Sequence, residues 1–228
     1  MKIATIAENL RLIRGRIGAA AERAGRDPAA VRLIGATSAS KGVRPEDVLE
    51  ALDGGLREFG ENYVQEAAKL KLALGARAAE ATWHFIGHLQ TNKAAAAVAL
   101  FDVIESVDSV RLAEQLSRRA AGTLPVLLEV NVAGEASKFG LAPREVAPAV
   151  RAIAALPNLD LRGLMTIAPA VPDPEAVRPV FRQLRQLAEA NGLAELSMGM
   201  TDDFEVAVEE GSTMVRIGRA IFAGGRQP

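Results

Sequence analysis

The stretch VRLIGATSASKGVRPEDVLEAL, residues 31–52, contains the unit from which the chain is built. Its first part, VRLIGAT, is an apolar run typical of a buried strand. Its last part, RPEDVLEAL, indicates the start of a helix near Pro45. A single lysine, Lys41, stands between the two. We therefore ask why the chain places an amine where a strand gives way to a helix.

The same strand-then-helix order recurs eight times along the chain, the last strand being followed only by a short helical turn in the tail. Regular alternation of this kind favours a parallel sheet covered by helices, and eight units favour a closed (β/α)8 barrel; an open doubly wound sheet is the alternative. The predicted strands are residues 31–38, 57–60, 82–87, 101–107, 123–132, 159–167, 194–199 and 213–218. The predicted helices begin near residue 45 or occupy residues 62–74, 91–100, 109–121, 142–156, 174–190 and 202–211.

An extra helix is predicted before the first strand. Apolar residues recur there at a 3-4-3-4 spacing, which places them on one face of a helix. They are Ile3, Ile6, Leu10, Ile13 and Ile17. Because this segment carries charge throughout and has no continuous apolar core, it does not resemble a targeting signal. No run of residues is long and apolar enough for a membrane span, so we expect a cytoplasmic protein.

Composition excludes several classes of function. With a net charge of −1, the chain has no general attraction for nucleic-acid backbones or anionic lipid. It contains no cysteine, which excludes disulfides, thiolate catalysis and zinc–sulfur sites. No linker, low-complexity segment or fixed-period repeat divides it, so residues 1–228 are expected to form a single domain.

Polar residues gather at the ends of the predicted strands, where barrels of this kind place their active sites. Lys41 and Arg216 are the most informative, because each lies within or beside an apolar run and a buried, unpaired charge is costly. A neutral lysine amine at this position could form a Schiff base with an aldehyde. A lysine that merely extends into solvent from a loop is the equally simple alternative.

The last two strand ends suit a phosphate group. SMGMTDD, residues 197–203, and RIGRA, residues 216–220, each place glycine just before a predicted helix start. Backbone N–H groups at helix starts bind anions, and barrels often hold phosphate at these two loops. Asp202 and Asp203 could instead simply cap the helix.

His84 and His88 are the only histidines. Their spacing matches two metal ligands on a helix, but WHFIGH has the pattern of a strand entering a loop. We therefore predict no metal site and no Ser–His–acid triad.

Six stretches together resemble the pyridoxal-phosphate homeostasis protein family, in order and over nearly the whole chain. They are FGENYVQEAAKLK, WHFIGHLQTNK, IESVDS, EVNVAGEASKFG, PNLDLRGLMTI and LSMGMTDDFEVAVEEGSTMVRIGRAIFAG. The resemblance implies a (β/α)8 barrel similar to the N-terminal domain of alanine racemase. It also implies that pyridoxal 5′-phosphate (PLP) is held as a Schiff base on the lysine that ends the first strand.

The family's lysine lies eighteen residues before the phenylalanine of FGEN, which here identifies Lys41, preceded by Ser40. One departure concerns this stretch. Where the family has one Ser or Thr before the lysine, this chain has SAS after LIGAT, which resembles a three-residue insertion. Matched from the upstream side, Ser38 would take the lysine's place. The downstream match is ungapped, and we therefore assign the role to Lys41.

The resemblance implies further cofactor contacts. Arg216 is expected near the pyridine nitrogen, where a cation keeps that nitrogen unprotonated and weakens the ring as an electron sink. Asn62 and Met165 are expected to line the pocket. The expected phosphate contacts are Ser197, Gly199, Thr201, Gly218 and Arg219.

The resemblance implies a binding protein rather than an enzyme. A two-base racemase needs an acid–base group on each face of the substrate carbon, and beside Lys41 we identify no second group. The only tyrosine, Tyr63, lies in a predicted helix. We expect a monomeric, non-catalytic PLP carrier that contributes to vitamin B6 and amino-acid homeostasis, with PLP-dependent apoenzymes as recipients. A weak PLP-dependent racemase, and a barrel that binds another phosphorylated metabolite without an imine, are the alternatives.

Overall fold

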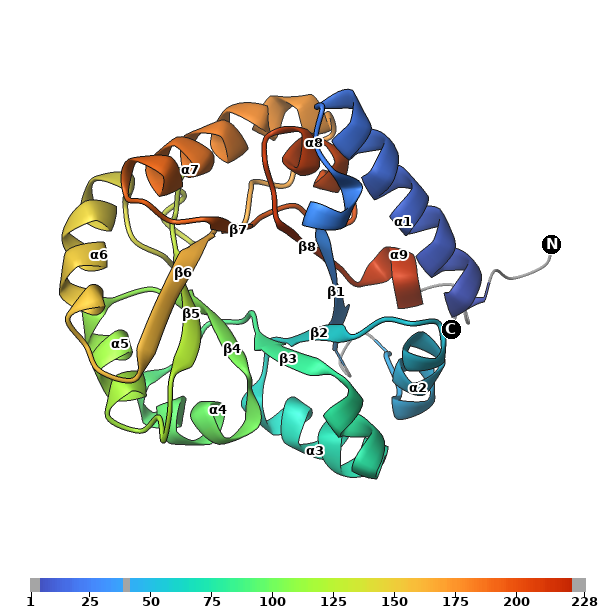
Figure 1. Cartoon of the computed structure of the whole chain (residues 1–228), viewed down its shortest axis with the longest axis horizontal. Coiled ribbons are helices and arrows are strands. Elements are labelled where there is room, and N and C mark those ends of the chain that lie inside the picture. The colour runs from blue at the N-terminus through green and yellow to red at the C-terminus, as the bar shows by residue number, and fades with distance from the viewer. Residues whose placement is uncertain (1–4, 39–41, 223–228) are drawn as a thin grey trace.

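In the computed structural model, which describes residues 5–38 and 42–222, eight parallel strands close into a barrel in the order β1 to β8 (Figure 1). Closure is made by β1, which pairs with β2 on one side and with β8 on the other. The closed barrel is confirmed and the open sheet is excluded. The strands are β1 (Arg32–Thr37), β2 (Glu58–Glu61), β3 (Thr82–Phe85), β4 (Val103–Val107), β5 (Leu124–Glu129), β6 (Leu159–Met165), β7 (Glu195–Ser197) and β8 (Met214–Ile217).

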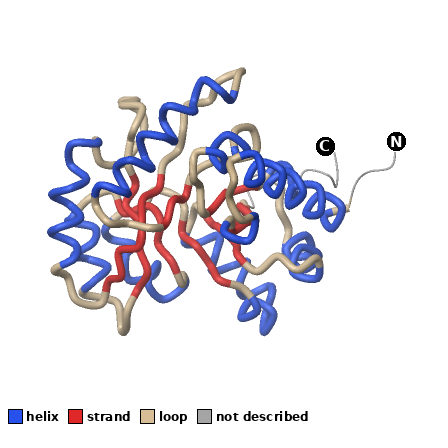
Figure 2. The backbone as a smooth tube through the Cα atoms, turned by 45° about the horizontal axis from the view of Figure 1, so that its top comes forward, coloured by secondary structure: helices blue, strands red, loops and turns tan. Residues whose placement is uncertain are grey.

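The helices form a layer around the strands, as the backbone view in Figure 2 shows. Several are shorter than predicted, because residues 91–93, 143–145 and 174–177 form 3-10 turns that precede the α-helix proper. The helices are α1 (Ile6–Arg23), α2 (Pro45–Asp53), α3 (Val64–Leu74), α4 (Ala94–Leu100), α5 (Val110–Ser117), α6 (Val146–Ala154), α7 (Arg178–Ala190), α8 (Phe204–Glu209) and α9 (Arg219–Phe222).

Helix α1 is the predicted extra helix, and it lies against α2, α8 and α9. Thr5 and Glu8 form a capping box at its start, which satisfies backbone N–H groups that have no partner within the helix. The predicted apolar stripe is buried from Ile6 to Ile17. Ile3 lies outside the described residues. The burial of this stripe shows why the helix packs beside the point where the barrel closes.

The barrel interior changes from apolar to polar along the strands. Five inward side chains form one apolar cluster: Ile34, Val103, Leu127, Met165 and Met214. Two residues further along, the same face of these strands carries Ala36, Glu105, Glu129, Ile167 and Arg216. Because side chains alternate across a strand, this step of two places charged groups inside the barrel, next to its C-terminal opening.

None of the helices within residues 5–38 and 42–222 combines the length and the hydropathy that a membrane crossing requires.

Candidate functional site

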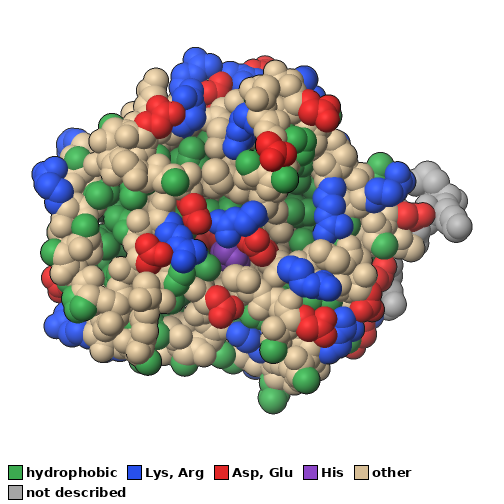
Figure 3. All heavy atoms as spheres, viewed as in Figure 1, with side chains coloured by type: hydrophobic (Ala, Val, Ile, Leu, Met, Phe, Trp, Pro, Cys, Tyr) green, Lys and Arg blue, Asp and Glu red, His purple; other side chains and the backbone are tan. Residues whose placement is uncertain are grey.

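A cavity of about 570 Å³ opens at the C-terminal ends of the strands, and we call it the mouth cavity. Figure 3, which looks down the barrel, shows charged side chains gathered around the central opening. The cavity is lined by the end of β1 and the residues that follow it, by residues that follow β2, β3, β6 and β7, and by β8 and α9 with the glycine between them. These residues are Ala36, Thr37, Ser38, Val43, Asn62, Ile86, Ile167, Met200, Thr201, Asp202, Arg216, Gly218, Arg219 and Phe222.

Arg216 is the buried cation of the mouth cavity, with only 4% of its surface exposed. Its Nη1 lies 2.5 Å from the hydroxyl oxygen of Ser197, and its Nη2 donates to the carbonyl of Thr166 at 2.8 Å. Neither acceptor is a carboxylate. Burial lowers the pKa of Arg216, opposed by the charges of nearby carboxylates, of which Glu105 acts most strongly. A guanidinium remains charged even so, which leaves a fixed positive charge at the cavity wall.

Ser197 connects Arg216 to a buried carboxylate. The Ser197 hydroxyl donates to Oε2 of Glu105 at 2.5 Å, and Oε1 of Glu105 lies 2.7 Å from Nδ1 of His84. His84, Glu105 and Ser197 are all fully buried. Nε2 of His84 lies 3.2 Å from Oε2 of Glu58, close enough for an ion pair though not aligned for a hydrogen bond. These groups form a polar chain that crosses the barrel interior, which we call the interior network.

The interior network keeps its members charged. Burial alone would lower the pKa of His84, but Glu105 and Glu58 outweigh burial and raise that pKa to about 9. Burial would likewise raise the pKa of Glu105, but the hydrogen bonds and charges of His84, Arg216 and Ser197 hold it below its ordinary range. At neutral pH the network therefore contains a histidinium in contact with a carboxylate, and a guanidinium joined to that carboxylate through Ser197.

A second buried carboxylate, Glu61, lies at the end of β2. Its Oε1 accepts a hydrogen bond of 2.5 Å from the hydroxyl of Thr37, which lines the mouth cavity. Its Oε2 has no hydrogen-bond partner among the described residues. Burial is the main cause that raises the pKa of Glu61 to about 7. Burial similarly raises the pKa of Glu129 to about 7.

Two glycines allow the last loops to approach the barrel closely. Gly199 has a φ of +94°, and a Cβ placed there would lie 2.5 Å from the Cβ of Ala207. A Cβ at Gly218 would lie 2.8 Å from the carbonyl oxygen of Ala36 in β1. Glycine is therefore required at both positions for packing, apart from any role with a ligand.

The structure brings together five of the predicted cofactor-binding residues. Asn62, Thr201, Arg216, Gly218 and Arg219 all line the mouth cavity.

The other predicted residues lie elsewhere. Met165 and Ser197 are fully buried and are not in the cavity lining; Met165 belongs to the apolar interior cluster and Ser197 to the interior network. Gly199 stands behind the lining, and its carbonyl accepts from the backbone N–H of Arg216 at 3.0 Å. Lys41 lies outside the described residues, so its assignment stays a prediction.

The two histidines lie in different parts of the barrel. Whereas His84 is in the barrel interior, His88 lies in the loop after β3, stacked on Phe139 at 3.6 Å between ring centroids and 3.3 Å from Asp108. Within the described part of the chain, no cluster of His, Asp and Glu has the arrangement of a metal site.

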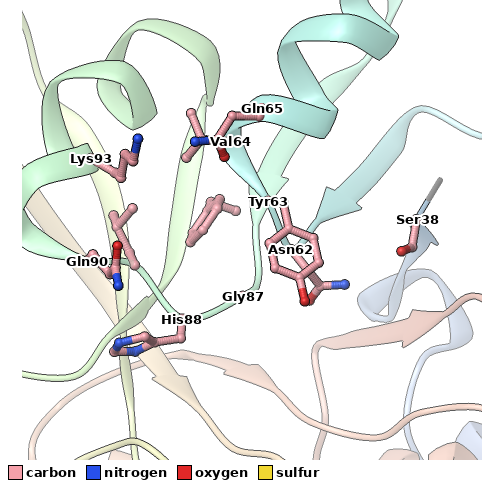
Figure 4. A pocket seen from close by; sticks show the side chains of 11 residues that line it. Ser38, Asn62, Tyr63, Val64, Gln65, Gly87, His88, Gln90 and Lys93 are labelled. Carbon is pink, nitrogen blue, oxygen red and sulfur yellow. The ribbon is translucent and has the colours of Figure 1, made fainter. Parts of the chain in front are cut away.

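His88 also lines a second cavity, of about 550 Å³, that shares Ser38 and Asn62 with the mouth cavity. Figure 4 shows this neighbouring groove, with Tyr63 at the start of α3 and Lys93 on its far side. The groove therefore continues the mouth of the barrel toward β3 and α3. The only tyrosine lies in its wall and is absent from the described lining of the mouth cavity.

Sequence reasoning missed the interior network. Glu105 and His84 lie inside short strands, whereas the residues predicted from the sequence lie mostly at or beyond the strand ends. A detectable signal was the charged residue at an inward strand position, as in VIESV, because a buried charge requires a partner.

Comparison with known proteins identifies relatives over nearly the full length of the chain. The family model described as "Alanine racemase, N-terminal domain" matches residues 3–225. The pyridoxal phosphate homeostasis protein of Pseudomonas aeruginosa is 45% identical over 96% of each chain.

Solved structures show the same architecture. PipY from Synechococcus elongatus, solved with PLP bound, superimposes with a TM-score of 0.83 at 34% identity, and covers 96% of this chain and 100% of its own. An alanine racemase from Corynebacterium glutamicum has a TM-score of 0.72 at 19% identity, over 97% of this chain and 62% of its own, which shows a shared fold.

Proposed function

This chain belongs to the alanine racemase N-terminal domain family and, within it, to the pyridoxal phosphate homeostasis proteins, and from this membership we propose that it binds pyridoxal 5′-phosphate in the mouth cavity. The observation that carries the proposal is Arg216, a buried guanidinium at the wall of that cavity. A relative with 34% identity, PipY, has been solved with PLP bound.

The residues present fit this cofactor. The cavity has the size of a small-ligand site, which typically measures about 300–1,000 Å³. Apolar side chains such as Ile86, Ile167 and Phe222 suit the faces of an aromatic ring. Arg219 suits a phosphate, because its ion pair with Asp202 is between exposed side chains and therefore weak enough to be exchanged.

We propose the following roles for the lining residues. Arg216 approaches the ring nitrogen and keeps it unprotonated, while Thr201, Gly218 and Arg219 contact the phosphate. Asn62 lines the ring edge. Ser197 supports Arg216 from behind, since its hydroxyl already contacts Arg216 and Glu105. The bound cofactor supplies an aldehyde that reacts with amines.

We propose Lys41 as the amine that holds this aldehyde as a Schiff base. Support comes from its neighbours in sequence, because Ser38 and Val43 both line the mouth cavity. The ungapped match downstream of Lys41 is a second support.

We further propose a carrier rather than an enzyme. Among the described residues of the mouth cavity, the only carboxylate is Asp202, which lies beside the proposed phosphate contacts Thr201 and Arg219, and no histidine or tyrosine is present. A two-base reaction needs a second proton-transfer group, which this lining does not supply. The protein would act as a cytoplasmic monomer that passes PLP to dependent apoenzymes and so contributes to vitamin B6 and amino-acid balance.

Borohydride reduction of the protein mixed with PLP, followed by peptide mapping, tests cofactor and lysine together. We expect one stable adduct on Lys41, which Lys41→Ala abolishes. The matched control is Lys93→Ala, because Lys93 lines the neighbouring groove. An adduct that persists in Lys41→Ala would contradict the assignment.

Incubation with L-alanine and chiral analysis tests the racemase alternative. We expect no turnover at ordinary enzyme rates, which are about 1 to 10³ per second. Racemisation within that range would overturn the carrier proposal.

A further inference from the structure

The interior network lies beneath the mouth cavity and includes buried charges that the proposed cofactor contacts do not use. Glu105 is its central member, because its two carboxylate oxygens connect Ser197 on one side with His84 on the other. It has no exposed surface and is absent from the lining of the mouth cavity. Glu105 therefore cannot touch a ligand in the mouth cavity directly, and any influence must pass through another residue.

That residue is Arg216. The Ser197 hydroxyl donates a hydrogen bond to Glu105 and accepts one from Arg216, both at 2.5 Å. Among the carboxylates that act on the guanidinium by charge, Glu105 acts most strongly, followed by Glu129 and Asp203. Of these three, only Glu105 is also joined to Arg216 through a hydrogen-bonded side chain.

We infer that Glu105 is a positioning residue for Arg216, which it holds through Ser197 in the orientation that the cofactor ring requires. This inference rests on the proposed function. His84 completes the arrangement, because its imidazolium neutralises Glu105 from the opposite side and its second nitrogen lies against Glu58. The guanidinium is thereby fixed before a ligand arrives, so that binding costs little further ordering.

Affinity for pyridoxine 5′-phosphate tests this inference, because that compound lacks the aldehyde and therefore binds without forming a Schiff base. We expect Glu105→Leu to raise the dissociation constant at least tenfold. Glu105→Gln should stay within threefold, because an amide oxygen can still accept from Ser197. The matched control is Glu129→Leu, which removes a buried carboxylate that acts on Arg216 by charge alone, and it should also stay within threefold.

The Arg216→Met background separates positioning from a general structural role. If Glu105 acts only through Arg216, Glu105→Leu should change the dissociation constant less than twofold once the guanidinium is gone. The absorption maximum of bound PLP should shift in the same direction in Glu105→Leu and Arg216→Met. An undiminished effect of Glu105→Leu in the Arg216→Met background would overturn the inference, as would an equal loss in Glu129→Leu.

Ser197→Ala provides a second route if Glu105→Leu does not fold. Ser197→Ala removes the hydroxyl that joins Glu105 to Arg216. We expect at least a threefold loss of affinity, and no such loss when Ser197→Ala is made in the Arg216→Met background. An affinity unchanged from the unsubstituted protein would overturn the inference. If the unsubstituted protein binds neither pyridoxine 5′-phosphate nor PLP, the first titration overturns the proposed function and the inference with it.

Discussion

Glu105 and Glu61 are two carboxylates buried at the same end of one barrel, yet they differ in charge. Glu105, in β4, contacts His84 and Ser197, and its pKa is lowered although burial opposes ionisation. Glu61, in β2, has the hydroxyl of Thr37 as its side-chain partner, and burial raises its pKa to about 7. The difference shows that cationic and hydrogen-bonding partners, rather than depth, decide whether a buried carboxylate stays ionised.

The two residues should therefore respond differently to removal. Glu105→Leu leaves Arg216 and His84 as buried charges without their shared carboxylate, and breaking a buried pair on one side costs about 3–5 kcal/mol of unfolding free energy. At pH 5 the Glu61 side chain is mostly protonated, because its pKa is raised to about 7, so Glu61→Leu removes no charge and we expect a change below about 1 kcal/mol. Urea unfolding of both variants at pH 5 measures the difference. Equal losses would remove the basis of the comparison.

The pH dependence of stability should follow Glu61. Its folded-state pKa of about 7 lies above the ordinary 4.5, so its stabilising contribution is complete below pH 4.5 and is lost as the pH rises through about 7. Glu61→Gln should match the unsubstituted protein at pH 4.5 and exceed its unfolding free energy at pH 8, by on the order of 3 kcal/mol. Urea unfolding at a series of pH values measures this. A difference that is constant with pH would contradict it.

Thr37 should have an intermediate effect. Thr37→Val removes the hydroxyl that donates to Glu61, and a buried acceptor left without its donor costs about 1–3 kcal/mol. Because this hydrogen bond lowers the pKa of Glu61, its loss should also move the pH-dependent change in stability to higher pH. Thermal unfolding at pH 6 and pH 8 checks both effects. Thr37→Ser is the control, since it retains the donor and should restore the original midpoint.

An exposed carboxylate should show the smallest effect. Glu114 forms a surface ion pair with Arg118 at 3.3 Å, and both side chains are largely in solvent. Glu114→Gln should change the unfolding free energy by less than about 0.5 kcal/mol at any pH. Urea unfolding in low and high salt measures this change in unfolding free energy. A loss comparable to that of Glu105→Leu would show that burial contributes little to the contrast.

Much of the fold could be predicted from the sequence because strand and helix patterns are local. The eight strands and the apolar stripe of α1 depend on residues two, three or four positions apart. Arg216 was also predictable, since a charge within an apolar strand stands out. The pairing of Glu105 with Ser197 was not, because these residues are far apart in the chain and meet only when the barrel closes.

The sequence by itself determined the succession of elements and the family. It also predicted which residues would contact a phosphate-bearing cofactor. The charge of each buried carboxylate was decided only by tertiary structure. Nothing local fixes the charge of either residue, since neither EFGE, which ends at Glu61, nor VIESV, which contains Glu105, includes a basic residue. Electrostatic energy depends on distance in space, and closing the barrel brings a histidine and an arginine toward Glu105, while Glu61 receives a neutral threonine.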